Sequence, residues 1–406
     1  MNKEYSDSNY YEGTETVREY NNYTERIPAG IRELQMEGGI YLYGNGAYAD
    51  KIMDILEKYS IAIEAVVVSK EYYTGTAFRN YTVICYEELL KRTSPLVVVA
   101  GFNLLVHKDL TNKLIEEKKI KKIYELCGFN KFVHNNYSFL HPKVCFIDNY
   151  NGVLTRNLTY DYFIDNKVLF EQTYEWLEDD QSKAVMETYL EGHIELTSFP
   201  MRKFWTCQCM ENQYFSEDVV KLGSNETFVD CGAFKGDTLE NFNKRVEGFK
   251  RYYAFEPDER CFDDLHRTMM SAKGEVIHVP FGAWDKRDTV SFSTGAAASA
   301  CGMIVNSVGK ERKTIAVDAI DNVIADDEAV SFLKMDIEGA ELKALMGAGK
   351  TIARCKPLLA ICVYHKREDL ITIPQYIKRL VKEYHFYLRS YMPYVGEVVL
   401  YGVCER

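Results

Sequence analysis

One segment, Val229–Asp237, constrains the fold of this chain more than any other. It reads VDCGAFKGD, follows the apolar, β-rich run Glu226–Val229, and leads into a stretch of helical character from Thr238 onward. Gly232 and Gly236 lack a Cβ, so the backbone can turn sharply here and approach a bound ligand closely. The pattern predicts a strand, a glycine-rich turn and a helix, as in nucleotide-binding α/β sheets.

An acidic residue stands where a nucleoside would need one. Glu256 closes a second apolar run, Tyr252–Phe255, nineteen residues after Asp237. An acidic side chain at the tip of the second strand is placed to accept hydrogen bonds from the two ribose hydroxyls. Carboxylates at Asp230 and Asp237 would repel a pyrophosphate and suit a cationic amino group or sulfonium. We therefore expect S-adenosylmethionine as the cofactor, while a glycine turn at a helix N-terminus also suits NAD.

Four segments carry a family resemblance. Asp230–Ala233 (DCGA), Phe255–Asp258 (FEPD), Phe332–Glu341 (FLKMDIEGAE) and Pro357–His365 (PLLAICVYH) look like successive motifs of the FkbM-type methyltransferases. The resemblance covers roughly residues 212–406, and the run from Asp336 to Glu341 is its most specific part. It implies a class I, S-adenosylmethionine-dependent enzyme that methylates hydroxyls of sugars and related natural products. Cys231 and Phe234-Lys235 depart from the Val and Asn-Ile usual in such proteins, which leaves the turn itself intact.

The expected cofactor site combines the glycine turn with the ends of the neighbouring strands. In a class I methyltransferase the region after the third strand, Val276–Val279, flanks the adenine, and Trp284 could cover the base or pack in the core. Cys231 is expected to pack rather than to act as a nucleophile. The expected cofactor-binding residues are Asp230, Cys231, Gly232, Ala233, Gly236, Asp237, Thr238, Glu256, Pro257, Gly282, Ala283, Trp284 and Asp336.

Two side chains are expected to act on the acceptor hydroxyl. A fourth strand, Val330–Met335, delivers Asp336 to the carboxyl edge of the sheet, and a fifth, Leu358–Val363, ends beside His365. A protonated hydroxyl is a poor nucleophile, so a base or a metal should take or weaken its proton. His365 is the expected base because unperturbed imidazole has a pKa near neutrality. Asp336 is expected to orient it, contact the cofactor, or join it in holding Mg²⁺ or Mn²⁺.

Glu338 and Glu341 are further catalytic candidates through the family resemblance alone. The pattern places both at the start of the helix after the fourth strand, where the helix dipole favours negative charge. The first two catalytic candidates also have a possible structural role. Asp336 could be a helix cap, and His365 could be a surface histidine whose hydrogen bonds are satisfied. No residues are assigned as metal ligands from the sequence.

The C-terminal pattern predicts how the sheet ends. An amphipathic helix from Ile373 to Tyr384, with Pro374 in its first turn, precedes strands at His385–Tyr391 and Glu397–Cys404. The resemblance implies a terminal hairpin of this kind, whereas an NAD dehydrogenase would more naturally continue with a parallel βα unit.

A second nucleotide-like unit precedes the first in the chain. Gly39–Tyr43 is a predicted strand, Gly44-Asn-Gly46 a turn and Ala47–Lys58 a helix, and apolar strands alternate with helices as far as Leu126. Gly44-x-Gly46-x-x-Ala49 matches a dinucleotide fingerprint, but Ser69-Lys70 stands where the acidic residue is expected. A structural or partner-binding role is favoured over a bound nucleotide or sugar nucleotide.

Composition excludes several classes of protein. The net charge of −11, with no basic stripe, argues against a nucleic-acid binder. The longest apolar runs are too short to span a bilayer. Eleven cysteines without disulfide-like spacing, and an N-terminus unlike a signal peptide, predict reduced thiols and a cytoplasmic location.

These patterns predict an α/β fold with two Rossmann-like units, the C-terminal one a class I methyltransferase sheet that ends in an antiparallel hairpin. The expected domains are an N-terminal extension (1–36), a Rossmann-like module (37–130), an aromatic-rich connector and acceptor-pocket region (131–222) and a methyltransferase domain (223–406). The expected function is O-methylation of a sugar hydroxyl on a small-molecule or glycan acceptor, such as a glycolipid. The alternatives are an NAD-dependent sugar-modifying oxidoreductase and a non-catalytic nucleotide- or sugar-binding protein. A homo-oligomer is compatible with the sequence.

Overall fold

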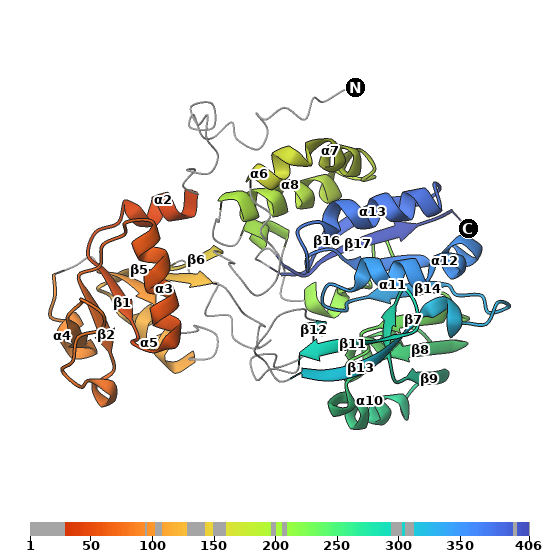
Figure 1. The fold of residues 1–406 in the computed structure, drawn as a ribbon, viewed down its shortest axis with the longest axis horizontal. Helices are drawn as coiled ribbons and strands as arrows, with labels where there is room; N and C mark the ends of the chain where they lie inside the picture. The colour runs from red at the N-terminus through yellow and green to blue at the C-terminus, as the bar shows by residue number, and fades with distance from the viewer. Residues whose placement is uncertain are drawn as a thin grey trace. The chain divides into compact units, whose positions relative to one another are not determined.

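The computed structural model divides the chain into two compact units, residues 1–161 with 189–200 and residues 162–188 with 201–406. Figure 1 labels many of the helices and strands of both. The residues that the structure describes are 29–93, 96–101, 108–127, 143–148, 160–195, 200–204, 209–293, 303–304, 312–392 and 396–405. The expected N-terminal extension therefore lies outside the described residues as far as residue 28.

The first unit contains a six-stranded, all-parallel sheet in the order β3-β2-β1-β4-β5-β6. Its strands are β1 (Ile40–Tyr43), β2 (Ala65–Val68), β3 (Val83–Cys85), β4 (Leu96–Ala100), β5 (Ile120–Cys127) and β6 (Val144–Asp148). Every residue of β1, β2 and β4 is buried, as continuous apolar strands covered on both faces should be. β6 comes from the segment that we expected to be a connector.

The helices of the first unit follow its strands in alternation. They are α2 (Ala29–Gln35), α3 (Ala47–Lys58), α4 (Tyr86–Leu89) and α5 (Lys108–Glu116), with a short 3₁₀ turn at Lys70–Tyr72. α3 buries Ala49, Ile52, Met53 and Leu56, which recur at helical spacing. The prediction of a doubly wound, Rossmann-like unit is confirmed.

The second unit is built on a seven-stranded sheet in the order β16-β17-β15-β14-β7-β8-β9. The strands are β7 (Thr227–Cys231), β8 (Arg251–Phe255), β9 (Glu275–Val279), β14 (Phe332–Met335), β15 (Leu358–Cys362), β16 (His385–Ser390) and β17 (Val398–Val403). The strands from β9 to β15 are parallel, and β17 pairs antiparallel with both β15 and β16. The predicted methyltransferase sheet with a terminal antiparallel hairpin is confirmed.

Helices cover this sheet, and several begin at different residues from those predicted. α13 (Asp369–Leu380) starts four residues earlier than expected, so Pro374 lies inside the helix and not in its first turn. α8 (Asp180–Glu195), of which residues 180–188 belong to this unit, is capped by Asp179, whose Oδ1 accepts a hydrogen bond from the Ser182 amide at 2.7 Å. The other helices of this unit are α6 (Tyr160–Asp165), of which residues 162–165 belong here, α7 (Lys167–Glu175), α9 (Asp237–Arg245), α10 (Phe262–Met269), α11 (Glu341–Gly347) and α12 (Gly349–Cys355).

A smaller four-stranded sheet belongs to the same unit, in the order β10-β13-β11-β12. Its strands are β10 (Gly282–Trp284), β11 (Asp288–Ser293), β12 (Met303–Ile304) and β13 (Arg312–Ala319). Short 3₁₀ turns complete the unit at Pro200–Phe204, Cys209–Asn212, Glu259–Cys261 and Ile320–Asn322.

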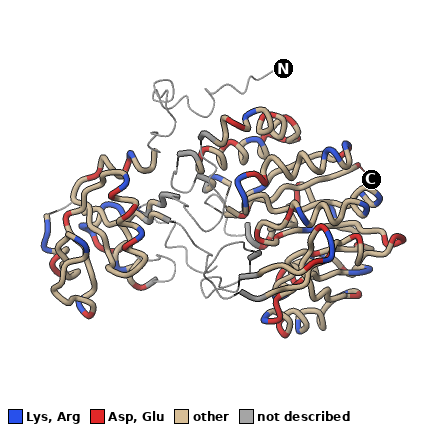
Figure 2. The backbone as a smooth tube through the Cα atoms, viewed as in Figure 1, with Lys and Arg blue, Asp and Glu red and all other residues tan. Residues whose placement is uncertain are grey.

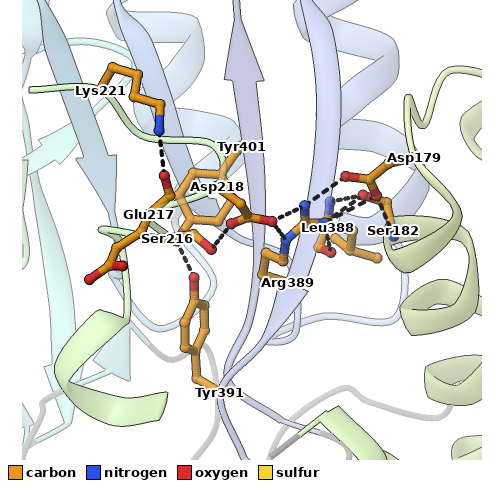
Figure 3. A network of polar contacts seen from close by, with 10 residues as sticks. All are labelled: Asp179, Ser182, Ser216, Glu217, Asp218, Lys221, Leu388, Arg389, Tyr391 and Tyr401. Atoms are coloured by element: carbon orange, nitrogen blue, oxygen red, sulfur yellow. Dashed lines mark hydrogen bonds and ion pairs between the residues drawn. The ribbon is translucent and has the colours of Figure 1, made fainter. Parts of the chain in front are cut away.

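A buried arginine joins the terminal hairpin to the start of α8 (Figure 3). Arg389 on β16 is 4% exposed, and its Nη2 lies 2.7 Å from Oδ2 of Asp179 and 2.6 Å from Oδ2 of Asp218. Its Nη1 donates to Oγ of Ser182 at 2.8 Å. These charge-assisted bonds fix the segment before β7 and the N-terminus of α8 against the hairpin.

Charges of both signs alternate along the described elements of each unit (Figure 2). None of the described helices is long and apolar enough to cross a membrane.

Candidate functional site

The carboxyl ends of β7 and β14 define the centre of the candidate site. β7 pairs with β8 on one side and with β14 on the other, so the strand order reverses between β7 and β14. Open α/β sheets bind ligands at such a switch point. Gly232 follows β7 and Asp336 follows β14, and an added Cβ on Gly232 would lie 2.1 Å from the carbonyl oxygen of Asp336. The predicted cofactor turn and the predicted catalytic acid therefore meet here.

The glycine turn is held against the end of β8. The amides of Gly232 and Ala233 donate to the carbonyl of Phe255 at 3.0 and 3.1 Å. Gly232 (φ 87°) and Gly236 (φ 89°) adopt left-handed conformations that a side chain would strain. Phe234 also has a positive φ, of 47°, so three residues of this turn depart from the ordinary backbone regions.

The sequence-predicted ribose ligand, Glu256, lies directly beside the turn. Its Oε2 accepts a hydrogen bond from the Phe234 amide at 2.8 Å, and its Oε1 accepts one from the Asp258 amide at 2.7 Å. The residue is 7% exposed. Burial raises the pKa of Glu256 to about 7, because the two amide bonds only partly offset the cost of desolvating the carboxylate.

Asp230 does not contribute a free carboxylate to the cofactor turn, which corrects the sequence-based expectation. Its side chain is fully buried, lies 2.9 Å from Nζ of Lys334 and accepts a hydrogen bond from the Tyr252 hydroxyl. Lys334 also donates to the carbonyl of Gly232 at 2.8 Å. Asp230 therefore acts on the turn through Lys334, which the sequence did not single out.

The other predicted cofactor residues lie around the same edge. Cys231 is fully buried as a packing residue, and burial raises the pKa of its thiol. Asp237 is exposed at the first position of α9, and Thr238 next to it is buried. Pro257 lies beside Gly282, since an added Cβ on Gly282 would be 3.8 Å from its Cγ.

Trp284 and Ala283 belong to the small sheet through β10. Trp284 packs against Ile315 and Val317, and the Gly347 backbone lies directly against its carbonyl. Trp284 therefore packs against the small sheet, and its predicted place over the adenine stays a prediction.

Asp336, Glu338, Glu341 and His365, the four predicted catalytic residues, come together in one cluster. Nδ1 of His365 lies 2.8 Å from Oε1 of Glu341. On the other side of the ring, Nε2 lies 3.4 Å from Oδ1 of Asp336 and 3.6 Å from Oε2 of Glu338. His365 and Glu341 are buried, whereas the Asp336 side chain is 23% exposed. The structure thus brings a buried imidazole between three carboxylates at the carboxyl ends of β14 and β15.

The surrounding carboxylates act on the protonation of the imidazole, which we expected to be the base. Burial alone would lower the pKa of His365, but the carboxylates of Glu341, Glu338 and Asp336 outweigh burial and raise it to about 10. These carboxylates favour the protonated ring, and another cation in the cluster would compensate them. His365 is also a buried residue, so the alternative of a surface histidine is wrong.

Glu338 does not open a helix, as we had expected. Its φ is 56°, the following Gly339 has a φ of 99°, and α11 begins only at Glu341. The left-handed pair carries the carboxylate of Glu338 back toward His365. Glu341 does occupy the first turn of α11, where its Oε1 also accepts a hydrogen bond from the Ile337 amide at 2.9 Å.

Sequence reasoning missed a tyrosine of the site. Tyr214 has a φ of 69°, and its hydroxyl donates to Oδ2 of Asp336 at 2.6 Å. The signal available in the sequence was the position of Tyr214 within residues 212–406, the stretch that carries the family resemblance. Nearby, Glu397 (φ 47°) accepts hydrogen bonds from Gln213 and from the Tyr364 hydroxyl at 2.8 and 2.9 Å. Strained backbone at such bulky residues is typical of functional sites.

Comparison with known proteins agrees with this geometry. Residues 230–397 match the family described as Methyltransferase FkbM domain. Among solved structures, methyltransferase FkbM from Methylobacillus flagellatus is similar with a TM-score of 0.63 and 22% identity, over 93% of this chain and 94% of that one. An rRNA methylase from Streptococcus thermophilus gives a TM-score of 0.29 and 14% identity, over 45% and 90% of the two chains. No curated protein sequence matches this chain.

Proposed function

We propose that this chain, whose residues 230–397 match the FkbM methyltransferase domain, transfers the methyl group of S-adenosylmethionine to a hydroxyl oxygen. The observation that carries the proposal is the meeting of Gly232 and Asp336 at the switch point between β7 and β14. A cofactor on the glycine turn and an acceptor on the Asp336 cluster would then be neighbours. Methyl transfer needs that alignment, because the displacement is in line.

The residues at this edge fit S-adenosylmethionine. The buried carboxylate of Glu256, fixed by two backbone amides beside the turn, is placed to accept ribose hydroxyls. With Asp230 committed to Lys334, Asp237 is the exposed carboxylate of the turn that suits the cationic amino group. When bound, the cofactor supplies an electrophilic methyl group on sulfur. The proposed contacts are with Gly232, Ala233, Gly236, Asp237, Thr238, Glu256, Pro257, Gly282 and Ala283.

Asp336 is the group that we propose receives the acceptor hydroxyl. Its side chain is the most exposed of the four in the cluster, at 23%, against 12% for Glu338, 1% for His365 and none for Glu341. Tyr214 holds one oxygen of Asp336, and the protonated ring of His365 lies beside the other. The carboxylate is thereby oriented to accept the hydroxyl hydrogen, while His365 positions it.

The acceptor that we propose is a sugar hydroxyl of a glycan, glycolipid or related metabolite. Support comes from the motif at Asp336–Glu341, which resembles that of sugar-methylating enzymes, and from the carboxylates that converge there as hydrogen-bond acceptors. A polyol acceptor offers several hydroxyl donors to such a group.

The first experiment measures methyl transfer. Full-length protein is incubated with labelled S-adenosylmethionine and glycan fractions, and glycans from cells with and without the protein are compared by mass. We expect an acceptor one methyl group lighter in cells that lack the protein. The Asp336→Asn variant should turn over roughly 10²–10⁴-fold more slowly while S-adenosylhomocysteine still binds. Near-normal rates in both Asp336→Asn and His365→Gln would show that alignment alone carries catalysis.

The second experiment tests the cofactor assignment against the oxidoreductase alternative. Glu256→Ala should weaken S-adenosylhomocysteine binding by roughly ten- to a hundredfold, the value of a charge-assisted hydrogen bond. Glu259→Ala, an exposed acid three residues away, is the matched control. Tight NADH binding that Gly44→Val abolishes would instead revive the oxidoreductase. We do not expect it, because Ser69 follows β2 and its Oγ lies 3.1 Å from the Tyr43 hydroxyl.

A further inference from the structure

One nitrogen in the cluster has the surroundings of a metal ligand. Nε2 of His365 is buried and makes no hydrogen bond, although two carboxylate oxygens face it. Leaving a buried ring nitrogen without a hydrogen bond is unfavourable, because the nitrogen loses its bonds to water and gains none in the folded protein. Asp336, Glu341 and His365 are the one group of possible ligands found among the described residues that lies within 4.8 Å.

The separations around Nε2 match those between ligands that share an ion. Metal–nitrogen and metal–oxygen bonds of about 2.0–2.2 Å place neighbouring ligand atoms about 3.0–3.5 Å apart. Nε2 lies 3.4 Å from Oδ1 of Asp336 and 3.6 Å from Oε2 of Glu338, and it forms a hydrogen bond with neither. An ion beside Nε2 would supply the partner that this nitrogen lacks, with the Asp336 carboxylate next to it and the Glu338 side chain rotating to join them.

The groups behind these atoms are arranged as supports for ligands. Oε1 of Glu341 lies 2.8 Å from Nδ1 of His365, a contact that is close but not well aligned, and the Tyr214 hydroxyl donates to the other oxygen of Asp336. A carboxylate behind a histidine fixes the ring with its second nitrogen toward a metal, and ligating carboxylates are themselves hydrogen-bonded. The left-handed backbone at Glu338 and Gly339 completes the arrangement by turning the third carboxylate inward.

We propose that His365 Nε2, Asp336 and Glu338 hold a divalent transition-metal ion, with Glu341 and Tyr214 as supporting residues. One imidazole and two carboxylates suit Mn²⁺ better than Mg²⁺ or Ca²⁺, which favour all-oxygen sites. Three protein ligands leave positions open to solvent or to an acceptor oxygen, and Asp336 is the exposed side of the site. A role of this ion in activating an acceptor hydroxyl rests on the proposed function. The binding of the ion itself does not depend on that function.

The test is direct metal binding to the full-length chain, which does not depend on methyl transfer. Metal-free protein is titrated with Mn²⁺ and followed by electron paramagnetic resonance. We expect saturable binding, with nitrogen hyperfine coupling that His365→Gln removes. Asp336→Asn and Glu338→Gln should each weaken binding at least about tenfold, and Glu341→Gln about 10–100-fold.

Glu328→Gln is the matched control. It removes a buried carboxylate that is paired with Lys250 and Arg251 before β14, whereas Asp336 follows that strand, so it should leave Mn²⁺ binding unchanged. Equal weakening by this variant would mean that only general negative charge attracts the ion, which overturns the proposal. The proposal would also be overturned if Mn²⁺ binding were not saturable, or if bound Mn²⁺ showed no nitrogen hyperfine coupling. If circular dichroism shows that Asp336→Asn does not fold, the Glu338→Gln variant still tests the metal site. The Glu338 side chain is partly exposed, so its replacement should not prevent folding. Metal binding without methyl transfer would count against the proposed function alone.

Discussion

Gly232 and Asp336 are in contact through their backbones: a Cβ on Gly232 would lie 2.1 Å from the Asp336 carbonyl oxygen. The contact joins the turn after β7 to the residue after β14, so the cofactor side and the acceptor side of the proposed site depend on one packing relationship. Gly232 is also in the left-handed region, with a φ of 87°. Two independent constraints thus require glycine at this position.

Gly232→Ala should destabilise the second unit by about 1–3 kcal/mol, through strain and the displacement of Asp336, and should weaken S-adenosylhomocysteine binding. Urea unfolding and calorimetry would measure the two effects. Gly46→Ala is the control, because no atom lies within 4 Å of an added Cβ there and its φ is −90°. A Gly232→Ala protein as stable as Gly46→Ala would contradict the packing described here.

Cofactor binding should depend on pH through Glu256. Its ordinary pKa of 4.5 is raised to about 7 in the folded protein. A raised carboxyl pKa means that its contribution to folding stability is full below about pH 4.5 and is lost as the pH rises through about 7, on the order of 3 kcal/mol in all. The ionised carboxylate is the better acceptor for ribose hydroxyls, so S-adenosylhomocysteine affinity should rise as the pH rises through about 7. Calorimetry of the wild type against Glu256→Gln would check this, since the variant should lack the pH-dependent step.

The Lys334–Asp230 pair should be essential for the stability of the second unit. Both side chains are almost fully buried and lie 2.9 Å apart, so Lys334→Met would strand a carboxylate in the sheet. A loss of about 3–5 kcal/mol is expected, measured by urea unfolding. Lys356→Met breaks a pair whose side chains are 42% and 63% exposed, and it should cost less than about 1 kcal/mol. Equal effects of the two variants would show that burial of the first pair is unimportant.

Arg389→Met should loosen the start of α8. Its partners Asp179 and Asp218 are 35% and 50% exposed, so water can solvate them, and the expected cost is about 1–3 kcal/mol. Arg389→Lys should recover little, because a single ammonium cannot bridge both carboxylates as the guanidinium does. Hydrogen exchange at the N-terminus of α8 is the measurement. Arg267→Met, at a site 75% exposed, should leave that exchange unaltered.

Tyr214→Phe should lower turnover while cofactor binding stays near normal. It removes only the hydroxyl that holds Asp336, a hydrogen bond to a charged group worth about 1.5–3 kcal/mol, which corresponds to roughly ten- to a hundredfold in rate. Tyr174→Phe removes a similar tyrosine-to-carboxylate bond, to Glu187 at 2.7 Å in α8, and serves as the control. An unchanged rate in Tyr214→Phe would show that Asp336 needs no such support.

The sequence by itself determined the elements whose signals are local. Continuous apolar runs predicted the parallel strands. Both faces of such a strand are buried, so its residues do not alternate between apolar and polar. The positions of Gly232 and Gly236 predicted the turn. Both residues have a positive φ, which residues with a Cβ rarely adopt. The order of these elements, with the motif at Asp336–Glu341, was sufficient to predict the methyltransferase sheet and its terminal hairpin.

Only the tertiary structure decided what charges and distant residues do. Asp230 looked like a cofactor ligand until burial paired it with Lys334, 104 positions along the chain. Three carboxylates surround His365 and raise its pKa, and Tyr214 reaches Asp336 across 122 positions. A pKa depends on burial and on the charges in space around a group, and the sequence pattern contains neither.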